Sequence, residues 1–128
     1  MVLDTSALLA ILEGEQERVA FSTKIAAADR TWISSATYLE AHIVIRTRRG
    51  AAGTGELSLY LHEAGTEIVS VDRDQADLAR LAYAQYGRGQ HRAALNYGDC
   101  FTYALAKTLA QPVLFKGDDF VHTDLVPA

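Results

Sequence analysis

Residues 95–106 read LNYGDCFTYALA, and this stretch predicts a helix with a carboxylate at its start. Asn96 and Gly98 are turn formers, so we expect Asp99 at the N-cap or in the first turn. Free N–H groups and the helix dipole favour a carboxylate there. The following apolar residues recur at helical spacing and predict a buried helix; they are Phe101, Ala104, Leu105, Ala106 and Leu109. Taken alone, Asp99 is best explained as a helix cap.

The composition describes one folded domain spanning residues 1–128, because 49% of the residues are hydrophobic and only two are proline. Cys100 is the only cysteine, which excludes an internal disulfide and a cysteine-based zinc site. No segment approaches the roughly 20 apolar residues of a membrane span, so we expect a cytoplasmic protein without membrane contact. A net charge of −4 argues against nucleic-acid binding by bulk attraction. It leaves open an acidic site that meets phosphates through a bound cation.

Four short strands alternating with helices are predicted along the chain. The strands are expected at residues 1–3, 31–34, 67–71 and 112–115. The helices are expected at residues 7–12, 19–29, 35–49, 56–64, from Asp72 or Asp74 to 83, and from Asp99 onward. Residues 50–55 are expected to be a flexible break, and residues 87–92 a basic, glycine-rich loop. This alternation predicts an α/β layer fold with a mainly parallel sheet.

Acidic residues are placed where they could meet at one end of this sheet. Asp4 directly follows the first strand, and Asp118 and Asp119 follow the last. Glu40 lies early in the helix after the second strand, and Asp99 opens the helix before the last strand. Sites in open parallel sheets form at the carboxyl ends of the strands. A cluster of like charges there is costly unless a cation neutralises it, and carboxylate oxygens suit Mg²⁺ or Mn²⁺. Such an ion can activate water and stabilise the leaving oxygen of a phosphodiester.

Four stretches, in order along nearly the whole chain, resemble a PIN domain, specifically a VapC-type toxin of a bacterial toxin–antitoxin pair. They are VLDTSAL (residues 2–8), SSATYLE (34–40), LNYGDCF (95–101) and LFKGDDF (114–120). The resemblance implies a PIN-like α/β/α sandwich and a metal-dependent endoribonuclease that cleaves structured RNA such as tRNA or rRNA. It also implies a homodimer and inhibition by a cognate VapB-type antitoxin that covers the acidic site.

The family's functional residues can be carried over to positions of this sequence. Its three core acids match Asp4, Glu40 and Asp99, and Ser6 matches a small hydroxyl residue that supports the site. Either member of the pair after the last strand could be the fourth acid. The resemblance therefore implies a catalytic set of Asp4, Glu40, Asp99, Asp118 and Asp119, and a metal-binding set of Asp4, Glu40, Asp99 and Asp118.

An acidic chain must hold RNA through local positive charge. The candidates are Lys116, Arg88, Arg92 and Arg46. Lys116 adjoins the acidic pair in sequence, so we expect it nearest the scissile phosphate. Arg88 and Arg92 are explained equally well by a phosphate contact or by a solvated loop.

Two other functions remain open. The first is a phospho-receiver-like signalling module, an α/β fold with an acidic pocket and a lysine, here Lys116, after the last strand. That module needs an acidic pair after the first strand, where only Asp4 is present, and a phospho-acceptor acid ending a central strand. The second is a catalytically silent, antitoxin-binding domain, and the intact set of acids argues against it.

Overall fold

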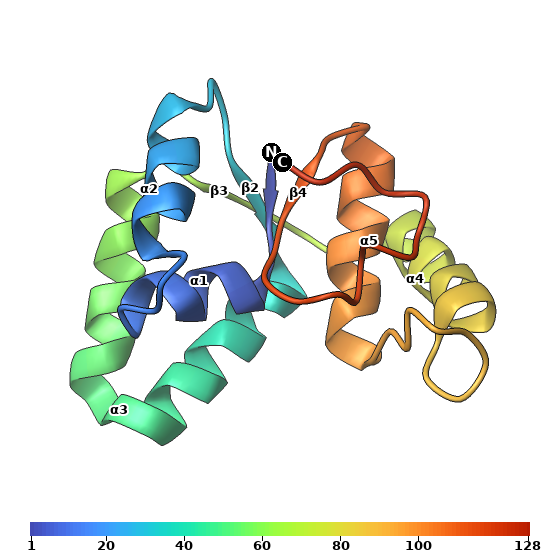
Figure 1. Cartoon of the computed structure of the whole chain (residues 1–128), viewed down its shortest axis with the longest axis horizontal. Coiled ribbons are helices and arrows are strands. Elements are labelled where there is room, and N and C mark those ends of the chain that lie inside the picture. Colours follow the sequence, from blue (N-terminus) through green and yellow to red (C-terminus); the bar gives the residue numbers. More distant parts are fainter.

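The computed structural model describes residues 1–128 and has a four-stranded sheet at its centre (Figure 1). The strands are β1 (Val2–Leu3), β2 (Trp32–Ser34), β3 (Glu67–Val69) and β4 (Val113–Leu114). They lie in the order β3-β2-β1-β4, and every neighbouring pair is parallel. The predicted α/β fold with a parallel sheet is confirmed.

Five helices cover the two faces of the sheet. They are α1 (Thr5–Leu12), α2 (Arg18–Ala27), α3 (Ser35–Glu63), α4 (Arg73–Tyr86) and α5 (Tyr97–Leu109). Helices α1, α2 and α3 lie on one side of the strands, and α4 and α5 lie on the other (Figure 1). This is the predicted α/β/α sandwich. None of the five helices combines the length and the apolar character needed to cross a membrane.

The core is divided between the two faces by the alternation of side chains along each strand. Leu3 and Leu114 point to one face and pack in the cluster formed with α1 and α3. Val2 and Val113 point to the other face and pack with Leu105 of α5. All of these side chains are at most 2% exposed. Burial on both faces explains why β1 and β4 are continuous apolar runs in the sequence.

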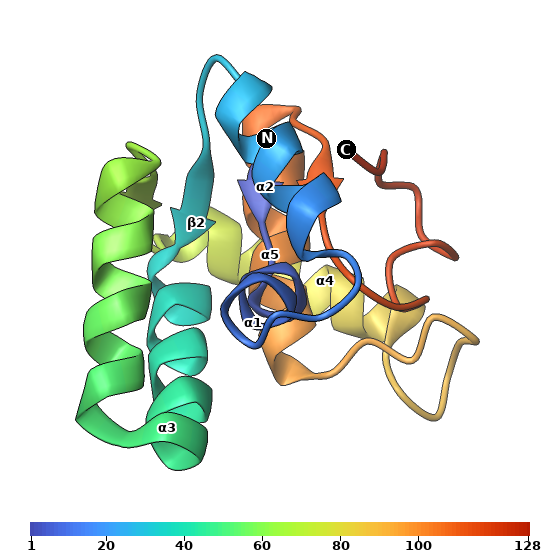
Figure 2. The same ribbon diagram turned by 60° about the vertical axis from the view of Figure 1, so that its left-hand side comes forward.

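Helix α3 is bent into a hairpin at Gly50, and this corrects the predicted flexible break over residues 50–55. Gly50 has φ 65° and ψ −155°, a conformation that is essentially restricted to glycine. The helix resumes at once, and its two limbs lie side by side in Figure 2. Gly53 allows this close approach, because a Cβ there would lie 3.1 Å from Cγ1 of Ile45 on the first limb. His42 Nε2 and Ser58 Oγ, 3.1 Å apart, also join the limbs.

The third strand is shorter than the predicted 67–71, because the backbone after Val69 bonds to other elements. The N–H of Val71 donates to Ser35 Oγ at 3.3 Å, and the carbonyl of Ser70 accepts from the Gln75 side chain at 3.2 Å. These bonds lead the chain out of the sheet and into α4. The other strands and helices agree with their predicted positions to within a few residues.

Candidate active site

Asp4 caps α1 at the end of β1, and its carboxylate is held from two sides. The residue is 5% exposed. Its Oδ2 accepts hydrogen bonds from the backbone N–H of Ser6 at 2.9 Å and from Ser6 Oγ at 2.6 Å. Its Oδ1 accepts from Thr102 Oγ1 of α5 at 2.8 Å. The Asp4 carboxylate therefore has a fixed orientation at the junction of β1, α1 and α5.

A buried chain of hydroxyl groups supports this carboxylate from behind. Thr102 Oγ1 lies 3.2 Å from Thr37 Oγ1 of α3, and neither threonine is more than 1% exposed. The single hydroxyl hydrogen of Thr102 is used on Asp4, so Thr37 must be the donor in the contact between the threonines. The sequence prediction missed both residues. The available signal was a hydroxyl residue, Thr102, inside an otherwise apolar helical stripe.

Asp99 lies in the first turn of α5 and forms a capping box with Asn96, the N-cap residue. Its Oδ2 accepts from the Asn96 N–H at 2.7 Å, and its own N–H donates to Asn96 Oδ1 at 2.9 Å. Burial raises the pKa of Asp99 to about 7; the bond from Asn96 opposes this rise, and the charges of Asp4, Asp119 and Glu40 add to it. Asp99 is thus a helix cap and also the centre of an acidic cluster.

Glu40 reaches this cluster from the second turn of α3. Its Oε2 accepts from Thr5 Oγ1 at 2.7 Å. Its carboxylate lies against Gly98 at the start of α5, where an added Cβ would be 2.3 Å from Oε1 of Glu40. Gly98 does not have a positive φ, so this position needs glycine for space and not for backbone conformation.

The fourth acid comes from the exposed turn after β4. Burial raises the pKa of Asp119, the charges of Asp4 and Asp118 raise it further, and Arg88 lowers it. Asp119 also acts on Asp99, whereas Asp118 is not among the charges that do. The charge of Asp119 thus acts on Asp99, and that of Asp4 acts on Asp119, whereas Asp118 acts on Asp119. Which member of the pair completes a metal site stays a prediction.

Known proteins resemble this chain over nearly its full length. The family model of the PIN domain matches residues 1–125. The chain belongs to the PIN-domain family. Ribonuclease VapC30 of Mycobacterium tuberculosis is 53% identical over 125 residues, which cover 98% of this chain and 95% of that protein. Ribonuclease VapC of Mycolicibacterium smegmatis is 54% identical over 125 residues, which cover 98% and 97% of the two chains. The predicted resemblance to VapC ribonucleases is confirmed.

Solved structures show the same fold. This PIN domain matches Mycobacterium tuberculosis VapC20, described as a Sarcin-Ricin loop cleaving toxin, with a TM-score of 0.81 over 99% of this chain and 97% of that one, at 14% identity. It matches a chain of a toxin–antitoxin complex from Klebsiella pneumoniae with a TM-score of 0.74, at 17% identity, over 99% and 95% of the two chains. At such identities the likeness concerns the fold. Family membership removes the phospho-receiver alternative.

The acids of this PIN domain fit a hard cation in chemistry and charge. They offer carboxylate oxygens, which Mg²⁺ and Mn²⁺ prefer. The pKa of Asp99 is raised first by burial and then by the charges of Asp4, Asp119 and Glu40, and a bound cation would offset both effects. No three acidic, histidine or cysteine side chains are already arranged to enclose an ion. Hydrogen bonds hold Asp4, Asp99 and Glu40, whereas Asp119 lies in an exposed turn.

Lys116 contributes its backbone to the site, and this differs from the prediction for its side chain. Its N–H donates to Ser6 Oγ at 2.9 Å, so it supports the residue that holds Asp4. Its ammonium instead pairs with Glu15 and with Glu17, the latter at 3.0 Å. The hydrogen bond to Glu15 and then that to Glu17 raise the pKa of Lys116. Its ammonium is therefore occupied in the loop between α1 and α2 and is not directed at the acids.

The three predicted RNA-binding arginines are all exposed. Arg88 is close enough to lower the pKa of Asp119, so its charge acts on the acidic cluster. Arg92 lies in the turn between α4 and α5, and Arg46 lies on the first limb of α3. Neither Arg92 nor Arg46 forms an ion pair. A contact of these residues with RNA stays a prediction.

Proposed function

We propose that this PIN domain is a metal-dependent endoribonuclease toxin that cleaves structured RNA such as tRNA or rRNA. The observation that carries this proposal is the convergence on buried Asp99 of acids from three other segments, which helps to raise its pKa to about 7. Such crowding costs stability, and a site that binds a cation explains why it persists. The VapC ribonucleases that share 53–54% identity with the chain support cleavage of RNA.

Mg²⁺ or Mn²⁺ bound here would supply an activated water and charge compensation at the scissile phosphate. Asp4, Glu40 and Asp99 would hold the ion, with Asp119 or Asp118 as the fourth acid. Ser6 and Thr102 keep the Asp4 oxygens oriented. Asp99 holds a proton over part of the neutral range when no ion is bound, because its pKa is about 7, and ion binding would displace that proton.

A VapB-type antitoxin is the proposed regulator of this ribonuclease. A cluster of acids invites a cationic side chain, and the arginine fork matches a pair of carboxylates. We expect an antitoxin arginine near Asp4 and Asp99, with an apolar antitoxin helix in a groove of the toxin. The toxin–antitoxin complex from Klebsiella pneumoniae, which has this fold, supports such a partnership. We also expect two copies of this chain to form a homodimer that acts on RNA in the cytoplasm.

The test is cleavage of total RNA by the purified chain, followed by sequencing of the new RNA ends. The wild type should cut at a few positions, and only when Mg²⁺ or Mn²⁺ is present. Asp99→Asn should lose at least about 99% of this activity and also most of the rise in melting temperature that the ions cause. Asp29→Asn, at an exposed acid after α2, is the matched control and should behave as the wild type.

Two outcomes would contradict the proposal. Equal cleavage by the wild type and Asp99→Asn would show that Asp99 is not a catalytic residue. A wild-type protein that binds its antitoxin but cuts no RNA would instead be the silent, antitoxin-binding domain.

A further inference from the structure

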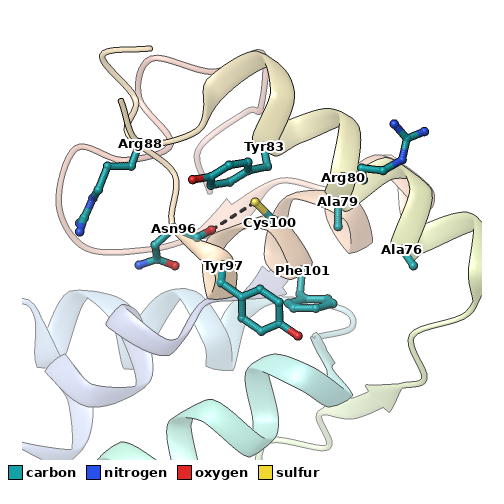
Figure 3. Close-up of a pocket in the computed structure, with 9 residues that line it drawn as sticks. All are labelled: Ala76, Ala79, Arg80, Tyr83, Arg88, Asn96, Tyr97, Cys100 and Phe101. Carbon is teal, nitrogen blue, oxygen red and sulfur yellow. Dashed lines mark hydrogen bonds between the residues drawn. The ribbon is translucent and has the colours of Figure 1, made fainter. Parts of the chain in front are cut away.

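We propose that a cavity between α4 and α5 binds one unpaired base of the RNA substrate, an inference that rests on the proposed ribonuclease function. The cavity has a volume of about 570 Å³, within the range of about 300–1,000 Å³ found for small-molecule sites. Figure 3 shows that it lies between α4 and the start of α5. The residues that carry the argument are Tyr83, Tyr97, Phe101, Arg80, Arg88 and Asn96.

Aromatic rings form the walls of this cavity. Tyr97 is 80% exposed and Tyr83 is 43% exposed, which is unusual for such large rings. Tyr83 lies on one wall, and Tyr97 and Phe101 lie on the other (Figure 3). The rings of Tyr97 and Phe101 meet edge to face, with centroids 4.9 Å apart. Such rings are the platforms on which unpaired bases stack in RNA-binding proteins.

The charge around the cavity suits an RNA backbone. No acidic residue lines it, although the chain has 16 acids and a net charge of −4. Arg88 and Asn96 lie at the same end of the cavity (Figure 3), and the charge of Arg88 acts on Asp119 of the acidic cluster. Arg80 makes only a loose, exposed ion pair with Asp77, at 3.6 Å, which a phosphate could replace. Phosphates on either side of a stacked base would therefore meet positive charge.

The cavity and the acidic cluster share the first turn of α5. Asn96 lines the cavity, and its backbone N–H binds the Asp99 carboxylate at 2.7 Å. Cys100, which is 4% exposed, closes the cavity beside Asp99 and donates its S–H to the Asn96 carbonyl at 3.2 Å. A base held against Tyr97 would therefore determine which phosphate lies at the acids. The cavity would act as a specificity site for the nucleotide beside the cleaved bond.

The experiment measures binding of two short, unstructured RNAs of about ten nucleotides by Asp99→Asn protein, which should leave them intact. One RNA carries bases, and the other has the same sugar–phosphate backbone without bases. Adding Tyr97→Ala should weaken binding of the base-carrying RNA about tenfold, since one stacked base is lost. It should not change binding of the abasic RNA. Tyr97→Phe keeps the ring and should bind within about twofold of the parent, as should Leu59→Ala, an exposed apolar control on α3.

Three results would overturn the proposal. Tyr97→Ala could weaken binding of both RNAs equally, or of neither. It could also dissociate a dimer in sedimentation without a base-dependent loss of binding, which would make this face an interface between copies of the chain.

The cleavage assay separates this proposal from the ribonuclease proposal. If the wild type cuts RNA and Tyr97→Ala has an unchanged KM, the base site is excluded and the ribonuclease proposal stands. If binding depends on the bases and on Tyr97 but the wild type cuts no RNA, the base site stands and the ribonuclease proposal is excluded.

Discussion

Asp99 carries a charge that the ion-free fold disfavours. Its pKa rises from 3.8 to about 7, first because the residue is buried and then because other acids surround it. The folded protein therefore holds a proton that the unfolded chain has already released. The contribution of Asp99 to stability is highest when both states are protonated and falls as the pH rises from about 4 to about 7. Metal-free wild-type protein should show this loss in urea unfolding.

Asp99→Asn should reduce that pH dependence, because an amide keeps the capping bond without the charge. At pH 8 in a chelator, we expect the variant to be more stable than the wild type by about 1 kcal/mol, or roughly 3–6 °C in Tm. Urea unfolding of both proteins between pH 4 and pH 8 measures the difference. A variant that is less stable than the wild type at pH 8 would show that Asp99 matters only as a helix cap.

Substitutions at Thr102 test whether the buried hydroxyl groups behind Asp4 hold its carboxylate in place. Thr102→Val removes the donor to Asp4 Oδ1 and the acceptor for Thr37, leaving buried polar atoms without partners. We expect a loss of about 1–3 kcal/mol in stability together with lower cleavage activity. Thr102→Ser keeps the hydroxyl and should retain most of the activity. Chemical unfolding and cleavage rates measure both effects. Equal activity of the valine and serine variants would show that the Thr102 hydroxyl is not needed to position Asp4.

A substitution at Gly98 tests whether the Glu40 side chain must lie against α5. Gly98→Ala would place a Cβ 2.3 Å from Oε1 of Glu40, so this flexible side chain must rotate away. Alanine favours helices, and stability should therefore change by less than about 1 kcal/mol. Cleavage should nevertheless fall at least about tenfold, because Glu40 leaves the acidic cluster. Unfolding and cleavage measured on the same preparation separate the two effects. Unchanged cleavage would mean that the position of Glu40 beside α5 is not needed.

At the scale of elements, α3 depends on a single backbone conformation. Gly50→Ala forces a side chain into φ 65° and ψ −155° and should cost about 1–3 kcal/mol. Gly55→Ala lies five residues later in the helical second limb, where a Cβ meets nothing within 4 Å. That control should be neutral or stabilising by up to about 1 kcal/mol. Urea unfolding compares the two variants, and equal stabilities would show that the bend at Gly50 is not held by its conformation.

At the scale of the whole molecule, an acidic protein must attract RNA through a local positive surface. We expect the double variant Arg88→Ala and Arg92→Ala to bind RNA more weakly. The log–log slope of affinity against salt should decrease by roughly 1 per lost phosphate contact. Cleavage at saturating RNA should persist, since neither arginine holds the acids in place. RNA titrations at several salt concentrations measure the slope. An unchanged affinity and slope would make this loop a solvated turn.

The amino-acid sequence was sufficient to predict the architecture of this protein. Short runs of residues with high strand propensity predicted the parallel strands, and helical spacing of apolar residues predicted the helices between them. These signals are local, because a residue's place in a strand or helix depends on its near neighbours. The bend in α3 was less well predicted. Glycines indicate a break, but the packing of Gly53 against Ile45 decides that the helix resumes directly after Gly50.

The sequence also indicated which acids could share a site, whereas only the tertiary structure decided how they are held. Thr102 binds Asp4 across 98 positions of sequence. Asp119, more than its neighbour, acts on Asp99, and the Lys116 ammonium turns away to Glu15 and Glu17. These outcomes depend on side-chain rotamers and on distances between segments that are remote along the chain. A one-dimensional pattern carries neither quantity, because both arise only when the helices have packed on the sheet.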